Sequence, residues 1–185
     1  MMQADFASAL RELDQVTQQI DGAVVENACE MIRAADRIVL YGCGREGLQI
    51  QGFAMRLHHL GLRVAMQGDM TTPPVGPDDL LIVSAGPGEL ATVRALMQIA
   101  GDAGAQVLFL TAEPQTASAA MADLILEVPA QTMAKDQNDN AKTVLPMGSV
   151  YEGALFLLFE IMVLRLRALT AATPEEMRAR HTNLE

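Results

Sequence analysis

The sequence predicts an α/β protein built as a three-layer sandwich, in which helices cover both faces of a five-stranded parallel sheet. The first observation is a set of short apolar runs rich in β-branched residues: RIVLY (37–41), LRVAM (62–66), LLIVS (80–84), VLFLT (107–111) and LILEV (124–128). The second is that helical stretches separate most of these runs. Because continuously apolar strands need cover on both faces, this alternation indicates a doubly wound sheet.

Helices are predicted wherever apolar residues recur at spacings of three and four. Before the first strand, residues 4–35 show this spacing in two consecutive runs. Between strands, the same spacing occupies three stretches: 47–60, 89–103 and 115–122. We therefore expect N-terminal helices over 1–35 and a sheet core over 36–130.

The C-terminal third is predicted to hold a loop, a long helix and a tail. The connection over 131–147 is polar in its middle, KDQNDN, and is expected to be mobile. The segment 148–169 follows as one helix that is apolar on nearly every face through LFLLFEIMVL. One sheet face cannot bury such a helix on all sides. The sequence therefore predicts a subunit interface along this helix, with the tail at 170–185.

Composition restricts the class of protein. A chain of 185 residues fits a single domain with a sizeable core. Thirteen basic residues against 23 acidic ones argue against a nucleic-acid surface. The longest apolar stretch, 154–164, contains Glu160 and is shorter than the ~20 residues that span a bilayer. With no signal-peptide pattern, and with Cys29 and Cys43 in no metal or redox spacing, we expect a cytoplasmic protein without metal or cofactor.

Three glycine-bearing loops follow predicted strands: GCGREG (42–47), GDMTTPPVG (68–76) and SAGPGEL (84–90). Ligands of doubly wound sheets bind beyond the carboxyl ends of the strands, and a glycine turn before a helix presents backbone N–H groups to an anion. The alternative is that these glycines only permit tight turns. Nucleotide binding is disfavoured, although the first loop reads GxGxxG, because Gln67 stands where a ribose-binding acid is expected and Asp69 is only nearby.

Longer stretches around these loops carry a family resemblance: GCGREGLQIQGFAMRLHHLG (42–61), GDMTTPPVGPDDLLIVSAGPGEL (68–90), AAMADLILEVP (119–129), PMGSVYEGALFL (146–157) and RHTNLE (180–185). Together they resemble the sugar isomerase (SIS) domain, most closely its 6-phospho-3-hexuloisomerase branch. The resemblance implies a five-stranded α/β sandwich of the flavodoxin type, a homotetramer and a small sugar or sugar derivative as ligand. It also implies isomerisation of a 3-ketose phosphate to its 2-ketose through an enediol, without a cofactor.

The sequence departs from that family at the loops that would bind phosphate. The family's SGSGET loop carries two serines and a threonine, where this chain has Ala85, Pro87 and Leu90. Glu46 replaces the serine that follows the first loop's arginine, and a one-residue slip would restore only Ser84. Repulsion between Glu46 and a phosphate amounts to about 1 kcal/mol per charge pair in water, and to more in a cleft. These changes favour a substrate other than hexulose 6-phosphate.

Backbone amides and one arginine still leave some capacity to bind an anion, so the loops remain the expected substrate site. The residues predicted to bind substrate are Gly44, Arg45, Glu46, His59, Thr71, Thr72, Ser84, Ala85, Gly86, Pro87, Gly88 and Glu89. His59 matches the family's HLG position, whereas its neighbour His58 points elsewhere because adjacent helical residues diverge by about 100°. The two threonines either bind a ligand hydroxyl or shape the turn.

Glu152 and His181 are the predicted catalytic pair. Moving a ketose carbonyl needs a base over two adjacent carbons and a second group that moves the hydroxyl protons. The resemblance assigns the base to Glu152, which otherwise is an acid favoured at a helix start by the dipole. It assigns the assisting role to His181, from the same chain or from a neighbouring subunit; the alternative is a solvated tail residue. Cys43 is interpreted as a packing residue.

The sequence thus favours a ketose isomerase of the SIS type. A non-catalytic SIS module that binds a carbohydrate derivative is the main alternative. A structural paralogue, whose tetramer matters more than its cleft, is a third.

Overall fold

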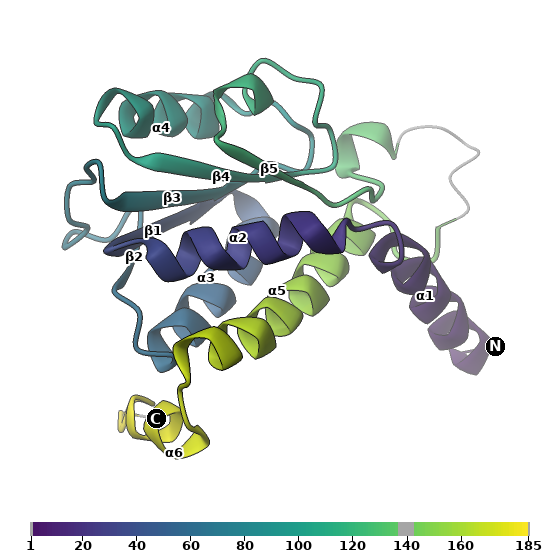
Figure 1. The fold of residues 1–185 in the computed structure, drawn as a ribbon. Coiled ribbons are helices and arrows are strands. Elements are labelled where there is room, and N and C mark those ends of the chain that lie inside the picture. Colours follow the sequence, from purple (N-terminus) through teal and green to yellow (C-terminus); the bar gives the residue numbers. More distant parts are fainter. Residues whose placement is uncertain (1, 137–142, 185) are drawn as a thin grey trace.

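The computed structural model describes residues 2–136 and 143–184. Within them, five strands form one sheet in the order β2-β1-β3-β4-β5, and every pairing is parallel (Figure 1). The strands are β1 (Arg37–Gly42), β2 (Val64–Met66), β3 (Asp79–Ser84), β4 (Gln106–Thr111) and β5 (Leu124–Glu127). The predicted five-stranded parallel sheet is therefore confirmed.

Helices cover both faces of the sheet, as Figure 1 shows. One face is packed by α2 (Gly22–Ala34), α3 (Gly44–His59) and α5 (Ser149–Thr170), and the other by α4 (Ala91–Asp102). The central strand β3 is buried at all six positions, and β4 at five of six. Strands buried on both sides have continuous apolar sequences, which explains why the apolar runs predicted them.

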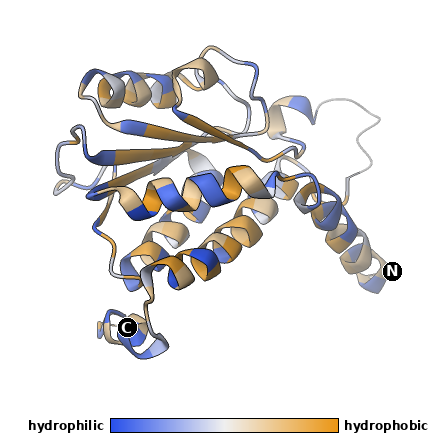
Figure 2. Cartoon of the chain, viewed as in Figure 1, coloured by the Kyte–Doolittle hydropathy of each residue, from blue (hydrophilic) through white to orange (hydrophobic). Residues whose placement is uncertain are grey.

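The core beneath α3 and α5 is centred on two aromatic rings. Phe53 of α3 and Phe159 of α5 stack with their centroids 4.3 Å apart and their planes 7° from parallel. Both side chains are buried, so the pair fixes the two helices against each other and against the sheet. Figure 2 shows the apolar strands of the sheet in orange between the two helical layers. This packing places the first turns of α3 and α5 at the same edge of the sheet.

The first and the last helix lie outside the sandwich. The N-terminal helix α1 (Met2–Thr17) contacts α5 and buries only Val16. The C-terminal helix α6 (Pro174–Ala179) contacts α3 and begins with a capping box, in which the Thr173 hydroxyl accepts from the Glu176 N–H. No helix in the described ranges is long and apolar enough to cross a membrane.

Two connections differ from their predicted form. The stretch 115–122 was expected to be helical, yet only Ala119–Met121 forms a single 3₁₀ turn. The hydroxyls of Thr116 and Ser118 donate to the loop before α4 instead, and such short polar side chains compete with helix formation. The connection over 131–147 contains a 3₁₀ turn at Met133–Lys135; its residues 137–142, where mobility was expected, lie outside the described residues.

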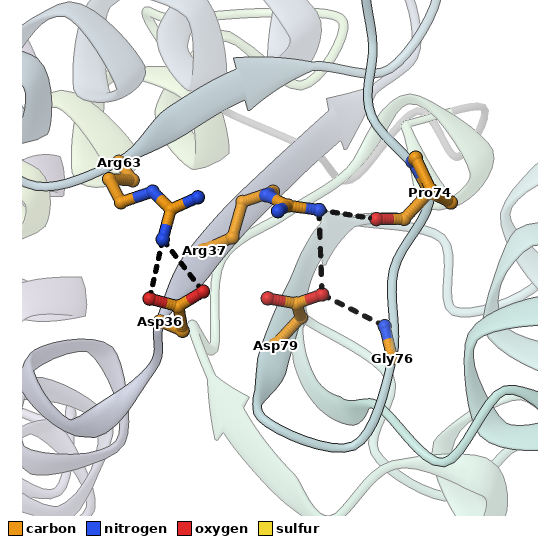
Figure 3. A network of polar contacts seen from close by, with 6 residues as sticks. All are labelled: Asp36, Arg37, Arg63, Pro74, Gly76 and Asp79. Atoms are coloured by element: carbon orange, nitrogen blue, oxygen red, sulfur yellow. Dashed lines mark hydrogen bonds and ion pairs between the residues drawn. The ribbon is translucent and has the colours of Figure 1, made fainter.

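Charged groups connect the amino ends of the strands, at the edge opposite the glycine loops 42–47 and 84–90 (Figure 3). Arg37 at the start of β1 donates to the Pro74 carbonyl at 2.6 Å and lies 3.8 Å from the Asp79 carboxylate. Asp79 in turn accepts from the Gly76 N–H at 2.9 Å. Arg63 pairs at 2.6 Å with the carboxylate that precedes β1. The contacts of Arg37 and Asp79 fix the end of the β2–β3 loop that lies away from the candidate site.

The long helix α5 leaves part of its apolar surface uncovered in the single chain. Nine of its residues are buried against α2, α3 and the sheet. Its opposite side exposes four large apolar residues: Phe156, Leu157, Ile161 and Leu164. Monomeric proteins seldom expose contiguous apolar patches of this kind. The helix therefore behaves as the sequence predicted, with more apolar surface than one chain buries.

Candidate functional site

The candidate site lies at the carboxyl edge of the sheet, between β1 and β3. These strands are neighbours, but the chain leaves β1 to form α3 on one face and leaves β3 to form α4 on the other. Such a reversal opens a crevice, the usual ligand position in open α/β sheets. Here it is a cavity of about 570 Å³, lined by residues within 43–46, 87–90, 132–134 and 147–152. We call this cavity the cleft.

Glu46 reaches across the cleft and holds the loop between β3 and α4. From the first turn of α3, its carboxylate accepts from the Ser84 hydroxyl at 2.7 Å and from the Gly86 N–H at 3.0 and 3.1 Å. The buried Tyr151 hydroxyl lies 3.2 Å from the same serine oxygen. A Cβ at Gly86 would stand 3.1 Å from the Glu46 carboxylate, so glycine allows this close approach. A carboxylate of the protein thus occupies the turn expected to bind an anion.

Two further N–H groups of this loop are also engaged. Ala85 donates to the Leu110 carbonyl at 3.0 Å, and Gly88 donates to the Ala85 carbonyl at 2.9 Å. Pro87 has no N–H group. The amides of Gly86, Gly88 and Glu89 are those that the sequence leaves available for an anion. The structure corrects this for Gly86 and Gly88, which already donate within the protein, but not for Glu89. From 85 to 88, the loop offers no free backbone donor.

Burial raises the pKa of Glu46, and the hydrogen bonds from Ser84 and Gly86 oppose that rise. Burial also raises the pKa of Tyr151 well above its ordinary value, and the nearby Glu46 charge adds to this effect. Tyr151 therefore stays protonated and can donate to Ser84, which donates to Glu46. The Ser84 hydroxyl thus stabilises the Glu46 carboxylate, and the buried Tyr151 hydroxyl in turn stabilises Ser84.

Glu152 supplies a second carboxylate to the cleft from the first turn of α5. Its side chain is 16% exposed, and its carboxylate lies 3.1 Å from Nε of Arg45. Arg45 also donates to the Ser149 hydroxyl at 3.0 Å and to the Met147 carbonyl. Burial raises the pKa of Glu152, Arg45 lowers it, and the Glu46 charge raises it. A carboxylate with a raised pKa that borders a cavity is suited to accept a proton.

Acidic groups outnumber basic ones among the described residues that line the cleft. The charged side chains there are Glu46, Glu89, Glu152 and Arg45. Three carboxylates against one guanidinium give these groups a formal charge of −2. Arg45 is paired with Glu152, and Glu89 is paired with Arg94 at 3.7 Å, outside the lining. Of the three carboxylates, Glu46 is the one without an ion pair in the described residues, and its charge disfavours an anion at its end of the cleft.

Thr132 is a polar residue of the cleft that the sequence analysis did not single out. Its side chain is buried, with 4% of the residue exposed, and it lines the cavity. Its hydroxyl finds no hydrogen-bond partner within the described part of the chain. Buried hydroxyls are normally paired, so this one marks a place where a ligand would gain a hydrogen bond. Nothing in the local sequence, a threonine in a polar connection, could have indicated it.

The structure brings most of the predicted site residues together at this edge of the sheet. Gly44, Arg45, Glu46, Pro87, Glu89 and Glu152 line the cleft. Ser84, Ala85, Gly86 and Gly88 belong to the loop that Glu46 holds. Cys43 also borders the cleft, and its sulfur lies 3.3 Å from the Tyr41 hydroxyl.

Four predicted residues lie elsewhere. His59 and His181 stack with ring centroids 5.2 Å apart at the C-terminal end of α3, whereas the cleft is at its N-terminal end. A helix of 16 residues separates the two ends by about 22 Å. The Thr72 hydroxyl donates to the Met66 carbonyl at 2.6 Å, as a turn-shaping residue does, and neither Thr71 nor Thr72 lines the cleft.

Comparisons with known proteins agree with this arrangement. A sequence model of the SIS domain matches residues 31–157, more than half of the chain. The chain belongs to the SIS domain family. This SIS domain is 33% identical to a Bacillus subtilis (strain 168) protein named 3-hexulose-6-phosphate isomerase, over 97% of this chain and 96% of that protein. It is 35% identical to a Methylomonas aminofaciens protein of the same name, over 84% of each.

A solved structure has the same fold as this SIS domain. It is a hypothetical protein from Methanococcus jannaschii, whose structure was described as implying a 3-hexulose-6-phosphate isomerase function. Its TM-score to this chain is 0.84 at 24% identity, covering 98% of this chain and 99% of that one. In the described ranges of this SIS domain, no group of three His, Cys, Asp or Glu residues could hold a metal ion.

The buried position of Glu46 in this SIS domain predicts a pH-dependent stability. The unfolded chain ionises Glu46 near its ordinary pKa of 4.5, whereas the folded chain keeps the proton to higher pH. Since the folded state binds more protons in this interval, stability falls as pH rises through it. Relative to Glu46→Gln, the wild-type free energy of unfolding should decline from pH 4.5 toward neutrality in urea titrations. A difference independent of pH would contradict this.

Proposed function

We propose that the chain is an isomerase that moves the carbonyl of a small ketose between adjacent carbons through an enediol, with Glu152 as the base. The observation that carries this proposal is the position of the Glu152 carboxylate at the wall of the cleft, 3.1 Å from Arg45, where burial raises its pKa. The curated relatives named 3-hexulose-6-phosphate isomerase support this reaction type.

The chemistry requires one carboxylate to serve two neighbouring carbons. Glu152 removes the proton from the carbon beside the carbonyl, and the electron pair moves to the carbonyl oxygen, giving an enediolate. The protonated Glu152 then returns the proton to the former carbonyl carbon. The hydroxyl proton of the neighbouring carbon passes to the former carbonyl oxygen, so the neighbouring oxygen becomes the new carbonyl. Arg45, 3.1 Å from Glu152, lies where its charge would stabilise the enediolate oxygen.

The alternative is a module that binds a carbohydrate derivative without turnover. One observation favours it: Glu46 closes the loop in which sequence analysis expected an anion to bind. A binding module, however, needs no carboxylate with a raised pKa facing its ligand, and Glu152 is such a group. Isomerisation therefore explains more features of the cleft than binding without turnover does.

Glu152→Gln should reduce catalysis by at least about 100-fold, the typical share of a positioned general base. The readout is deuterium uptake from D₂O at the carbon beside the carbonyl, followed by NMR with 3-hexulose 6-phosphate, fructose 6-phosphate and fructose. This readout detects proton abstraction even without net isomerisation. Glu160→Gln, on the outer part of the same helix and paired with Arg56, is the matched control and should keep full activity. Equal uptake by Glu152→Gln and wild type would remove Glu152 from the mechanism.

The exposed apolar side of α5 supports assembly into a homotetramer. Leucine, isoleucine and phenylalanine side chains on this side are each between 39% and 57% exposed in the single chain. Pairing them between copies would remove them from water, at roughly 25 cal/mol per Å² of buried apolar surface. The same association would let His181 of one chain help move the hydroxyl protons in the cleft of another, since His181 lies at the wrong end of α3 to reach its own Glu152.

Introducing charge on this side of α5 should dissociate the protein. The double variant Ile161→Glu, Leu164→Glu should sediment as a smaller species than wild type, because it would bury two carboxylates at the interface. Ile99→Glu on α4 is the matched control, since Ile99 is 61% exposed on the opposite layer of the sandwich. A wild-type chain that sediments as a monomer at micromolar concentration would contradict the proposed assembly.

Mixing two variants tests whether His181 acts on the cleft of another copy. Oligomers that combine Glu152→Gln chains with His181→Ala chains contain some clefts with an intact glutamate and a neighbour's intact histidine. Their activity should exceed the mean of the two parent variants. Activity equal to that mean, in oligomers shown by mass spectrometry to be mixed, would contradict a contribution in trans.

A further inference from the structure

Glu46 holds a position that a bound anion would otherwise take. The only N–H group between residues 85 and 88 that points away from the protein's own carbonyls is that of Gly86, and both oxygens of Glu46 accept from it. The Ser84 hydroxyl, at the end of β3, donates to the same carboxylate. An incoming phosphate would have to displace Glu46 to reach either donor.

The backbone around Glu46 leaves little room for such a displacement. Glu46 stands in the first turn of α3, whose Gly47 is packed against the end of β1. A Cβ at Gly47 would lie 2.5 Å from the Gly42 carbonyl oxygen, so helix and strand are in direct backbone contact. The first turn of α3 therefore cannot shift toward β1, and a rotation of the Glu46 side chain is the smallest movement that takes it out of the loop.

Charge opposes the same displacement. A phosphate in the loop would add a dianion to lining residues that already carry a formal charge of −2. The one guanidinium of the lining is held by Glu152, Ser149 and the Met147 carbonyl. Freeing it would leave Glu152 without its partner. The cleft thus lacks a cation that could accompany an anion into the loop.

The groups that do face this end of the cleft accept hydrogen bonds or are neutral. Oε1 of Glu46 accepts only the shared Gly86 bond, so it retains capacity for a donor. Thr132 lines the same cavity, and its methyl carbon would lie 3.2 Å from a Cβ at Gly86. Its buried hydroxyl has no hydrogen-bond partner in the described ranges. A carboxylate oxygen with spare capacity beside such a hydroxyl matches a ligand group that donates hydrogen bonds.

We propose that Glu46 determines the substrate class of the cleft: it selects a sugar whose end at the β3–α4 loop carries a hydrogen-bond donor, a hydroxyl or an amine, and it excludes a phosphate. This rests on the proposed function only in taking the ligand to be a sugar. Glu46 acts as a specificity residue, and Thr132 provides the second hydrogen bond to the same end of the ligand.

Open-chain sugar alcohols test this without any reaction, because they lack the carbonyl. Glucitol, 6-amino-6-deoxyglucitol and glucitol 6-phosphate are titrated calorimetrically into wild type, Glu46→Ser and Glu46→Gln. Wild type should bind glucitol 6-phosphate more weakly than it binds glucitol or 6-amino-6-deoxyglucitol. Glu46→Ser should bind the phosphate at least about 10-fold more tightly than wild type does, as expected when a charged group gains hydrogen bonds. Thr132→Val should weaken glucitol binding. Added to Glu46→Ser, it should leave the gain in affinity for glucitol 6-phosphate unchanged.

Asp69→Asn is the control for net charge, since Asp69 is an exposed carboxylate in the loop after β2. This variant should bind glucitol 6-phosphate no more tightly than wild type does. If Glu46→Ser fails to fold, the isosteric Glu46→Gln still reports the loss of charge. The proposal is overturned if neither Glu46 variant gains phosphate affinity, or if Asp69→Asn gains as much. Deuterium uptake by Glu152→Gln decides the proposed function independently, because that readout does not involve Glu46.

Discussion

The hydrogen bonds from Ser84 and Gly86 to the carboxylate of Glu46 are the interaction on which the cleft depends. At this edge the chain leaves two adjacent strands toward opposite faces of the sheet, so no backbone pairing joins the first turn of α3 to the loop before α4. The carboxylate makes that connection. Because a buried carboxylate without donors is costly, the same bonds that close the loop also keep Glu46 ionisable inside it.

The second carboxylate is coupled to the first through charge. The Glu46 charge raises the pKa of Glu152, and Arg45 lowers it from the other side. Arg45 is itself oriented by contacts to the start of α5, the helix that carries Glu152. Substitutions at Glu46 would therefore alter the proton affinity of Glu152 as well as the shape of the loop. Recognition at one end of the cleft and proton transfer at the other are electrostatically linked.

The sequence predicted the sheet because strands buried on both faces must be apolar throughout, and it predicted Glu152 and Glu46 at one site through the family resemblance. It could not predict which side of α5 faces the chain: Leu158 is 5% exposed and Ile161 is 57% exposed, yet both belong to one apolar run. Periodicity carries no information when every face is apolar. Likewise, the place of His181 depends on where α6 docks, which tertiary contacts decide.

The loop between β3 and α4 shows why its substitutions belong together. Ala85 and Pro87 remove donors that an anion would need, and Glu46 takes the N–H group of Gly86 that remains. From Ser84 to Gly88, every hydrogen-bond donor therefore has an acceptor within the protein. This part of the loop needs no bound anion, while the Thr132 hydroxyl beside it still lacks a partner in the described part of the chain. A ligand gains most, therefore, by placing a hydrogen-bond donor beside Glu46 and Thr132 and leaving Glu46 where it is.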